Sequence, residues 1–102
     1  MAVDLILSPE AEQDIDEAYV WYERQRAGLG EDFLASLDVC IQGIRRSPRM
    51  HAFIFEHFRR GLVRRFPYAV FYDYAEAENT VTVYCVIHTS RDPDKWRTRL
   101  SE

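Results

Sequence analysis

A histidine and an arginine near the C-terminus could do acid–base and phosphate chemistry together. His88 ends an apolar run, and Arg91 follows three positions later. Histidine is the side chain that most often gives or takes a proton near neutral pH, whereas arginine binds phosphate through a planar fork of donors. RNA cleavage at its own 2′-hydroxyl needs a base, an acid and a cation for the phosphorane, so this pair would supply two of the three groups.

A second cationic set lies upstream, in the segment RRGLVRR, and consists of Arg59, Arg60, Arg64 and Arg65. Together these arginines create a local positive field that suits phosphate or carboxylate. Side chains alternate between the two faces of a strand, so only one of Arg64 and Arg65 would face a site. That one would complete a catalytic set with His88 and Arg91.

Structural roles account for the same residues equally well. His88 could hydrogen-bond a backbone group at a strand end. The arginine pairs could lie on a solvated strand and face Asp73 or Glu76 across a hairpin. Asp92-Pro93 is a helix-start pattern with the aspartate as its cap, and Trp96 is expected to close the core over that turn.

The strand that would position His88 is predicted over Thr80–His88, and we expect it to be innermost in a sheet. Its apolar residues recur with a period of two, at Val81, Val83, Cys85 and Ile87. Two further strands are predicted over Gly61–Phe66 and Tyr68–Tyr74, with turns at Pro67 and at residues 76–79. Along the second of these, one face carries Tyr68, Val70, Tyr72 and Tyr74.

Two amphipathic helices are predicted after a first strand over Val3–Leu7. The first runs from Pro9, capped by Ser8, to about Arg26, and the second from about Glu31 to Arg46. A short Gly-containing segment joins them into a hairpin. On the first helix, Trp21 falls on the charged face with Asp14 and Glu17, where it either packs against a loop or contacts a partner.

The helix hairpin must cover an apolar surface, and the sheet provides one. We expect the stripe Phe33, Leu37, Cys40 and Ile44 to pack on Val81, Val83, Cys85 and Ile87. Residues 49–58 alternate poorly and are predicted as loop with room for a short edge strand. The predicted class is α+β, β-α-α-β-β-β, with the helical hairpin on one face of a mostly antiparallel sheet and residues 1–102 as a single domain.

Charge and composition narrow the function classes. The net charge is −4, and Lys95 is the only lysine, whereas proteins that grip nucleic acid through phosphates normally carry surplus cations. No CxxC or HxxxH spacing occurs, so no metal or cofactor is expected. Cys40 and Cys85 read as reduced core residues rather than a disulfide. Without a membrane-spanning run or signal peptide, we expect a cytoplasmic protein.

Three segments together resemble the RelE/ParE family of toxins from bacterial type II toxin–antitoxin modules, and its ParE-like branch most closely. They are SPEAEQDIDEAYVWYE, YAVFYDY and VIHTSRDPDKWRTR. The resemblance implies the fold predicted above and a cognate antitoxin whose C-terminal segment wraps the toxin. It also implies one of two targets, because RelE-like members cut mRNA on the ribosome whereas ParE-like members poison DNA gyrase without being nucleases.

Two functions therefore stay open. One is a ParE-like inhibitor of DNA gyrase without catalytic residues, and the other is a ribosome-dependent endoribonuclease that uses His88, Arg91 and Arg64 or Arg65. A third is a relative that only binds its partner. The sequence departs from the ribonuclease pattern, since Trp96 stands where such enzymes often place a tyrosine. The expected partner-binding residues are Trp21, Arg59, Arg60, Arg65, Arg97 and Arg99.

Overall fold

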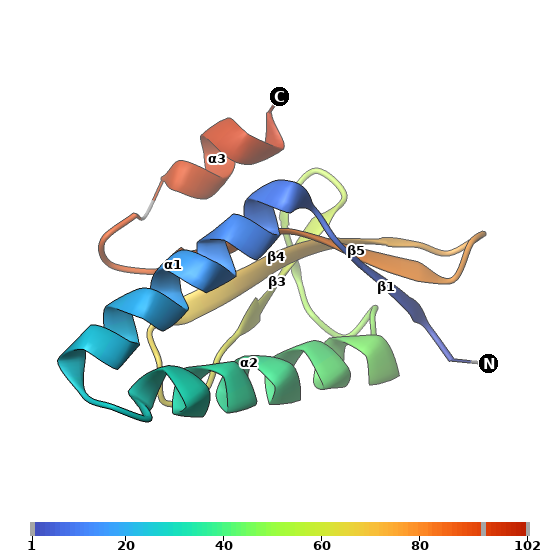
Figure 1. Ribbon diagram of the computed structural model, residues 1–102. Helices are drawn as coiled ribbons and strands as arrows, with labels where there is room; N and C mark the ends of the chain where they lie inside the picture. Colours follow the sequence, from blue (N-terminus) through green and yellow to red (C-terminus); the bar gives the residue numbers. More distant parts are fainter. Residues whose placement is uncertain (1, 93, 102) are drawn as a thin grey trace.

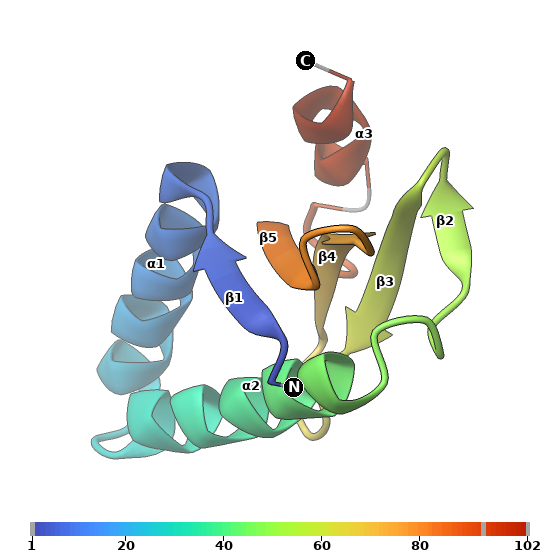
Figure 2. The same ribbon diagram turned by 90° about the vertical axis from the view of Figure 1, so that its right-hand side faces the viewer.

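The computed structural model describes residues 2–92 and 94–101 and has the α+β architecture predicted from the sequence (Figure 1). Its elements, in chain order, are β1 (Asp4–Leu7), α1 (Pro9–Gln25), α2 (Leu29–Arg46), β2 (Phe53–Phe55), β3 (Phe58–Leu62), β4 (Tyr68–Ala75), β5 (Thr80–His88) and α3 (Lys95–Leu100). The α1–α2 hairpin covers one face of the sheet, and α3 packs on the other (Figure 2). Within these residues, no helix combines the length and apolar character that a membrane span needs.

The five strands form one sheet in the order β1-β5-β4-β3-β2. Only β1 and β5 run parallel, and the other neighbouring pairs are antiparallel. β5 pairs on both sides, but the central strand is β4, so the expectation that Thr80–His88 is innermost is wrong. At one end of the sheet His88 lies opposite Tyr68, which brings the candidate histidine beside an aromatic ring.

Both helices of the hairpin begin with well-made caps. The Ser8 hydroxyl accepts the Ala11 N–H at 3.0 Å, so α1 starts where the sequence predicts. α2 starts at Leu29, two residues earlier than predicted, because Glu23 Oε1 accepts the N–H groups of Gly28 and Gly30 at 3.0 and 2.8 Å. A Cβ on Gly30 would lie 2.7 Å from the Glu23 side chain, so glycine permits this close approach of the two helices.

A β-bulge interrupts the pairing of β4 with β5. Phe71 pairs with Cys85, but the next residue, Tyr72, pairs with Val83. Tyr84 is therefore an extra residue on β5, and the alternation of side chains reverses beyond it.

The bulge divides the apolar residues of β5 between two cores. Val81 and Val83 face the helix hairpin, and beyond the bulge Val86 takes that direction. Cys85 and Ile87 belong to the core on the opposite face. The predicted packing of the α2 stripe on β5 is therefore right for the first two residues and wrong for the last two, because a strict period of two does not survive an inserted residue.

The core under the helix hairpin is otherwise close to expectation. Phe33, Leu37 and Ile44 of α2 are buried, Ile41 joins them, and Cys40 is half-buried at the margin. On β4 the alternation predicted from the sequence is confirmed, with Tyr68, Val70, Tyr72 and Tyr74 facing the hairpin. Cys40 and Cys85 are both free thiols, as predicted, and they belong to different cores.

The opposite face of the sheet is covered by α3, which the predicted element order lacks. Trp96 stacks on Phe71 with ring centroids 5.3 Å apart, which confirms that it closes the core at this point. The helix begins at Lys95 with Asp94 in the cap position, so the expected cap role of Asp92 is wrong. Pro93, the expected first helical residue, lies outside the described residues.

The strand predicted over Gly61–Phe66 has wrong bounds. β3 covers Phe58–Leu62 and pairs with the short edge strand β2, which lies within the segment predicted to have room for one. After Leu62 the chain turns, and Arg65 adopts a φ of 72°, a left-handed conformation that a strand cannot contain. Arg64 and Arg65 therefore project from a turn rather than alternate along a strand.

Candidate functional site

His88 is held as a hydrogen-bond acceptor at the end of β5. Its Nδ1 accepts the backbone N–H groups of Ser90 at 3.1 Å and Arg91 at 2.9 Å. A ring nitrogen that accepts two N–H groups carries no hydrogen, so in the neutral ring the hydrogen resides on Nε2. Desolvation and the charge of Arg91 lower the pKa of His88 below its usual value, against an opposing effect of Asp92. The half-buried histidine therefore caps the loop that follows β5, and the neutral ring suits this role because Nδ1 accepts both N–H groups.

Arg91 joins this cap to α1. Its guanidinium donates to the Tyr68 hydroxyl at 2.8 Å and lies over the Trp21 ring, 4.7 Å from the ring centroid. The Tyr68 ring meets His88 edge to face at 5.3 Å. The four residues form a continuous network from α1 across the end of the sheet to the loop, which we call the Arg91 network.

A polar cavity of about 220 Å³ lies beside the Arg91 network. Besides that network it is lined by Asp14, Glu17, Ala18, Val86, Ile87, Asp92 and Lys95. Arg64 and Arg65 line a different cavity, so only two of the three groups of the expected catalytic set meet here. The structure brings His88 and Arg91 together but places neither Arg64 nor Arg65 in their cavity.

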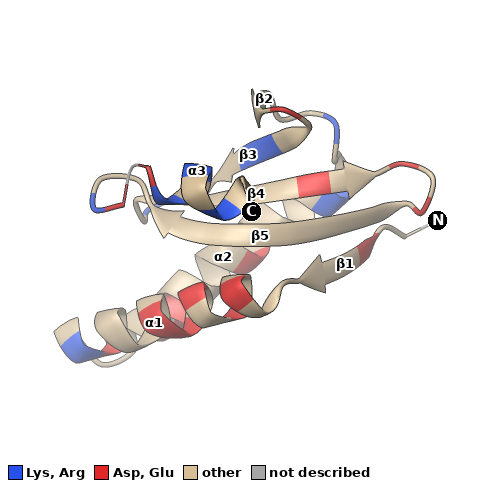
Figure 3. Cartoon of the chain, turned by 90° about the horizontal axis from the view of Figure 1, so that it is seen from above, with Lys and Arg blue, Asp and Glu red and all other residues tan. Residues whose placement is uncertain are grey.

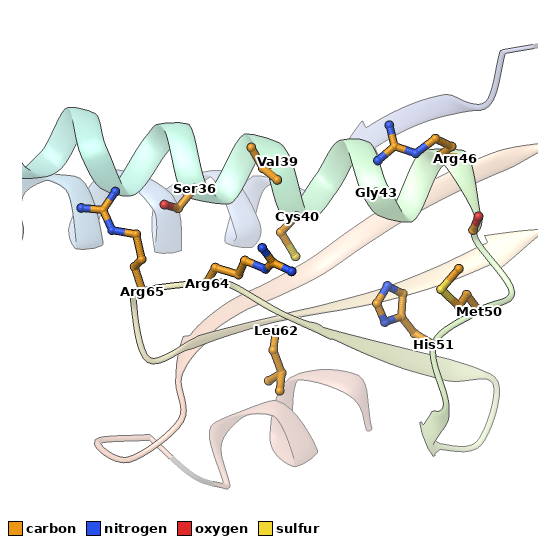
Figure 4. A pocket seen from close by; sticks show the side chains of 11 residues that line it. Ser36, Val39, Cys40, Gly43, Arg46, Met50, His51, Leu62, Arg64 and Arg65 are labelled. Carbon is orange, nitrogen blue, oxygen red and sulfur yellow. The ribbon is translucent and has the colours of Figure 1, made fainter.

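The larger cavity, of about 590 Å³, is an open groove between α2, the chain after it and β3 (Figure 4). We call it the α2–β3 groove; its lining residues are Ser36, Val39, Cys40, Gly43, Arg46, Ser47, Met50, His51, Leu62, Arg64 and Arg65. Val39 and Met50 are largely exposed there, with relative accessibilities of 64% and 75%. Three arginines and no acidic residue line the groove, so it combines apolar surface with net positive charge.

The arginines predicted to form one partner surface are distributed over several places. Arg59 donates to the carbonyl oxygens of Arg49 at 3.0 Å and His51 at 2.7 Å and stacks over Phe53, so it holds the chain between α2 and β2. Arg60 borders a small hollow beside Trp96 on the α3 side of the sheet. Of the four arginines in RRGLVRR, only Arg64 and Arg65 line the α2–β3 groove.

Arg99 is engaged inside the molecule. Its guanidinium donates to the Asp14 carboxylate at 2.7 and 3.2 Å and to the Tyr84 carbonyl at 3.1 Å. The same carboxylate accepts the Val86 N–H at 3.0 Å. The hydrogen bond to Asp14 is the main cause that raises the pKa of Arg99, and desolvation opposes it. Asp14, assigned to the charged outer face by the sequence, is in fact buried.

The C-terminal arginines consequently differ in availability. Arg97 is exposed, lies over the Trp96 ring at 5.1 Å from the centroid and contacts Asp94 at 3.9 Å, whereas Arg99 is committed to Asp14. Acidic residues are concentrated along α1 instead (Figure 3). The exposed ones on this helix are Glu10, Glu12, Asp16 and Glu17. The molecule thus presents an acidic helix α1 and, between α2 and β3, an arginine-lined groove.

Comparison with known proteins gives a consistent result. A family model described as "ParE toxin of type II toxin-antitoxin system, parDE" matches residues 5–93, which end before α3. Among solved structures, the chain is similar to one from a chromosomal ParDE toxin–antitoxin system of P. aeruginosa, with a TM-score of 0.73 and 11% sequence identity. That superposition covers 85% of this chain and 96% of the other.

Two further structures share the fold. One is a chain of the RelBE2 toxin–antitoxin complex of Mycobacterium tuberculosis, with a TM-score of 0.61, 15% identity and coverage of 86% of this chain and 99% of that one. The other is a mutant of the E. coli toxin RelE in the free state, with a TM-score of 0.62, 15% identity and coverage of 99% and 97%. Among curated protein sequences no significant match was found.

Proposed function

We propose, from the premise that this chain belongs to the ParE toxin family of type II toxin–antitoxin systems, that it inhibits DNA gyrase by binding and is neutralised by a cognate antitoxin. Both partners would be met in the cytoplasm. In the ParE-like branch that the sequence resembles, inhibition of gyrase does not involve a nuclease reaction. The proposal therefore requires a stable binding surface and no assembled catalytic set.

The geometry of His88 carries the proposal. A general base would need a free lone pair on the outward nitrogen Nε2, and the tautomer that provides it would place a hydrogen on Nδ1, against two N–H donors. A general acid would need the imidazolium, which meets the same conflict and is disfavoured by the lowered pKa. Capping the loop and transferring protons are thus competing uses of one ring.

Charge also favours binding over the ribonuclease alternative. A nuclease that sits on ribosomal RNA needs many phosphate contacts. In this chain Arg59, Arg91 and Arg99 already make internal contacts, and Arg64 and Arg65 lie in another cavity from His88. Few cations are left to form a ribosome-binding surface around the histidine.

The α2–β3 groove fits the proposed antitoxin. Exposed Val39 and Met50 offer apolar contact, and Arg46, Arg64 and Arg65 offer charge-assisted bonds to carboxylates. A segment that becomes ordered on binding gains from both kinds of contact. We therefore place an acidic, amphipathic part of the antitoxin in this groove.

Two parallel assays test the target. Supercoiling by purified DNA gyrase and mRNA cleavage on translating ribosomes are measured with increasing amounts of the chain. We expect inhibited supercoiling and intact mRNA. His88→Asn keeps a short acceptor near the two amides and should inhibit like the wild type, whereas loss of a proton-transfer group would lower a cleavage rate ~100-fold to 10,000-fold. Unaffected gyrase with mRNA cleavage that depends on His88 would refute the proposal.

Charge reversal tests the antitoxin site. Arg65→Glu should weaken the complex with the cognate antitoxin strongly, because it places a carboxylate against acidic residues of the partner. Arg24→Glu makes the same charge change on α1, outside the groove, and should leave the affinity nearly unchanged. Titration calorimetry measures both affinities. Equal affinity of wild type and Arg65→Glu would refute the α2–β3 groove as the antitoxin-binding site.

A further inference from the structure

An exposed aromatic residue stands on the outer side of α1. Trp21 keeps 43% of its accessible surface and its neighbour Val20 keeps 44%. Neither residue belongs to the two cores of the protein. Tryptophan is among the residues that most often dominate the binding energy of protein interfaces, so its exposure here requires a reason.

Trp21 is held in one position although it is exposed. Arg91 lies over its ring at 4.7 Å, and the buried Tyr22 meets it edge to face with centroids 5.0 Å apart. Tyr68 in turn fixes Arg91 through a hydrogen bond of 2.8 Å. A side chain fixed in this way loses little conformational entropy when a partner covers it.

Hollows flank Trp21 on two sides. One, of about 360 Å³, is lined by Asp16, Glu17, Val20, Trp21 and Arg24. The other is the cavity of about 220 Å³ beside the Arg91 network. Trp21 and Glu17 line both, so the indole forms a ridge between two depressions that each contain a carboxylate. We call Asp16, Glu17, Val20 and Trp21 the Trp21 ridge.

The charge of this surface selects its partner. α1 exposes four acidic residues, and Arg24 is the one basic residue that lines the outer hollow. The inner hollow carries both signs of charge, because Arg91 and Lys95 line it together with Asp14, Glu17 and Asp92. The acidic side of the ridge is therefore the outer one, where an acidic segment would be repelled by Asp16 and Glu17. Lysine and arginine have an apolar stem and a charged head, so such a side chain could lie along Val20 and Trp21 and reach Asp16 or Glu17.

We infer that the Trp21 ridge is the surface through which the chain binds a basic segment of the protein that it inhibits. The inference rests on the proposed function, because it names the target-facing surface of the same inhibitor. The groove for the acidic antitoxin lies beside α2 and β3, whereas α1 packs at the β5 side of the sheet. The two partners therefore meet the toxin through surfaces of opposite charge.

Growth arrest on expression without antitoxin tests the inference without presuming the target. The variants are Trp21→Ala and the double reversal Asp16→Lys with Glu17→Lys. Asp38→Lys with Glu78→Lys is the matched control, because it changes the net charge equally at exposed positions away from the ridge. Circular dichroism and the thermal midpoint confirm that each variant is folded. Affinity for purified DNA gyrase is measured in parallel.

Trp21→Ala should weaken gyrase binding by about 30-fold, the loss typical of an aromatic hot spot, and relieve growth arrest. The double reversal should do the same, and wild-type binding should weaken with added salt. Arrest as strong in both variants as in the wild type overturns the inference, whether or not gyrase binds.

The outcomes separate the inference from the proposed function. Variants that lose arrest while the wild type shows no affinity for gyrase would support the ridge and refute gyrase as target. If the wild type binds gyrase and the variants bind it and arrest growth equally well, the proposed function stands, and the Trp21 ridge is refuted as the target-binding surface. A wild type that causes no arrest would refute both.

Discussion

Removing the Asp14 carboxylate should destabilise the protein more than any change at a surface ion pair. The Asp14 side chain is 6% exposed and that of Arg99 is 18% exposed, so both charges are largely shielded from water. Asp14→Ala leaves the guanidinium and the Val86 N–H without this acceptor. Breaking a buried pair by removing one partner costs roughly 3–5 kcal/mol, and the partial exposure of Arg99 favours the lower end.

That loss would be plain in a thermal melt. For a domain of about this size, a loss of 1 kcal/mol in the free energy of unfolding lowers the Tm by roughly 4–8 °C. A loss of about 3 kcal/mol in Asp14→Ala should therefore lower the Tm by roughly 12–24 °C. Asp14→Asn retains an acceptor for the Val86 N–H but not the charge, and should lose less. Circular dichroism melts at low protein concentration, checked for reversibility, would measure both variants.

A double-mutant cycle isolates the pair from the loss of packing. Asp14→Ala, Arg99→Ala and the combined variant should give a coupling energy of about 1–3 kcal/mol, as residues in one ion-pair network do. Coupling smaller than about 0.5 kcal/mol would mean that the two side chains act independently. The Arg99–Asp14 contact would then not be what holds α3 against α1.

Three further outcomes follow from burial and hydrogen bonding. Ile44→Ala and Ile87→Ala should each cost about 2–5 kcal/mol in urea unfolding, and their effects should add because the two residues lie in different cores; an unchanged midpoint would contradict the packing. Burial raises the pKa of Cys40 to about 11 and that of Cys85 to about 12, so a thiol reagent at pH 7 should label both slowly, and rapid labelling of Cys85 would be inconsistent with its burial. Folding lowers the pKa of His88, so the unfolded chain binds a proton at this residue at a higher pH than the folded chain does. The free energy of unfolding should therefore fall as the pH drops below 6.5, and it should fall less in His88→Asn. Equal pH profiles of wild type and variant would exclude this linkage.

Local patterns in the sequence were sufficient for the helix hairpin and for β4. Ser8-Pro9 supplies a side-chain acceptor and a residue without an N–H at the two positions where a helix start uses them. Along β4 the alternation of Tyr68, Val70 and Tyr72 survives because this strand carries no extra residue. Such features depend on neighbours within a few positions, which a sequence displays directly.

The bulge in β5 was not predictable from the same kind of pattern. Val86 is as apolar as Cys85 and Ile87, so apolar residues face the core under the helix hairpin whether or not Tyr84 is an extra residue in the strand. The pairing with β4 decides between the two registers, and that information is not local. A polar residue at position 86 would have revealed the change of face.

The burial of Asp14 did leave a signal in the sequence. Ala11, Asp14, Ala18 and Tyr22 recur at spacings of three and four, and these are the buried residues of α1. Asp14 was assigned from the sequence to the charged face with Trp21 and Glu17, because an aspartate on an apolar face is expected to be excluded unless it is paired. Its partner, Arg99, lies 85 positions away, and no local pattern points to it.

Arg97 and Arg99 illustrate a related limit. Residues two apart on a helix do not share a face, so the two arginines of α3 could not form one surface once the helix existed. One of them turns inward to Asp14 and the other to solvent. Both were expected to bind a partner, because the predicted order of elements ended with Thr80–His88 and assigned no helix faces to the residues after Asp92-Pro93.

The bulge and the Asp14–Arg99 pair together fasten the end of β5 beside the candidate binding surface. An extra residue in a strand leaves backbone groups without ladder partners, and here Asp14 accepts the Val86 N–H while Arg99 donates to the Tyr84 carbonyl. Two residues later the His88 ring caps the loop that carries Arg91. The end of β5 is thus fixed to α1 and α3 before any partner arrives. Trp21, which lies under Arg91, can therefore present a preformed surface. If the chain inhibits by binding, as proposed, a surface that does not rearrange increases its affinity.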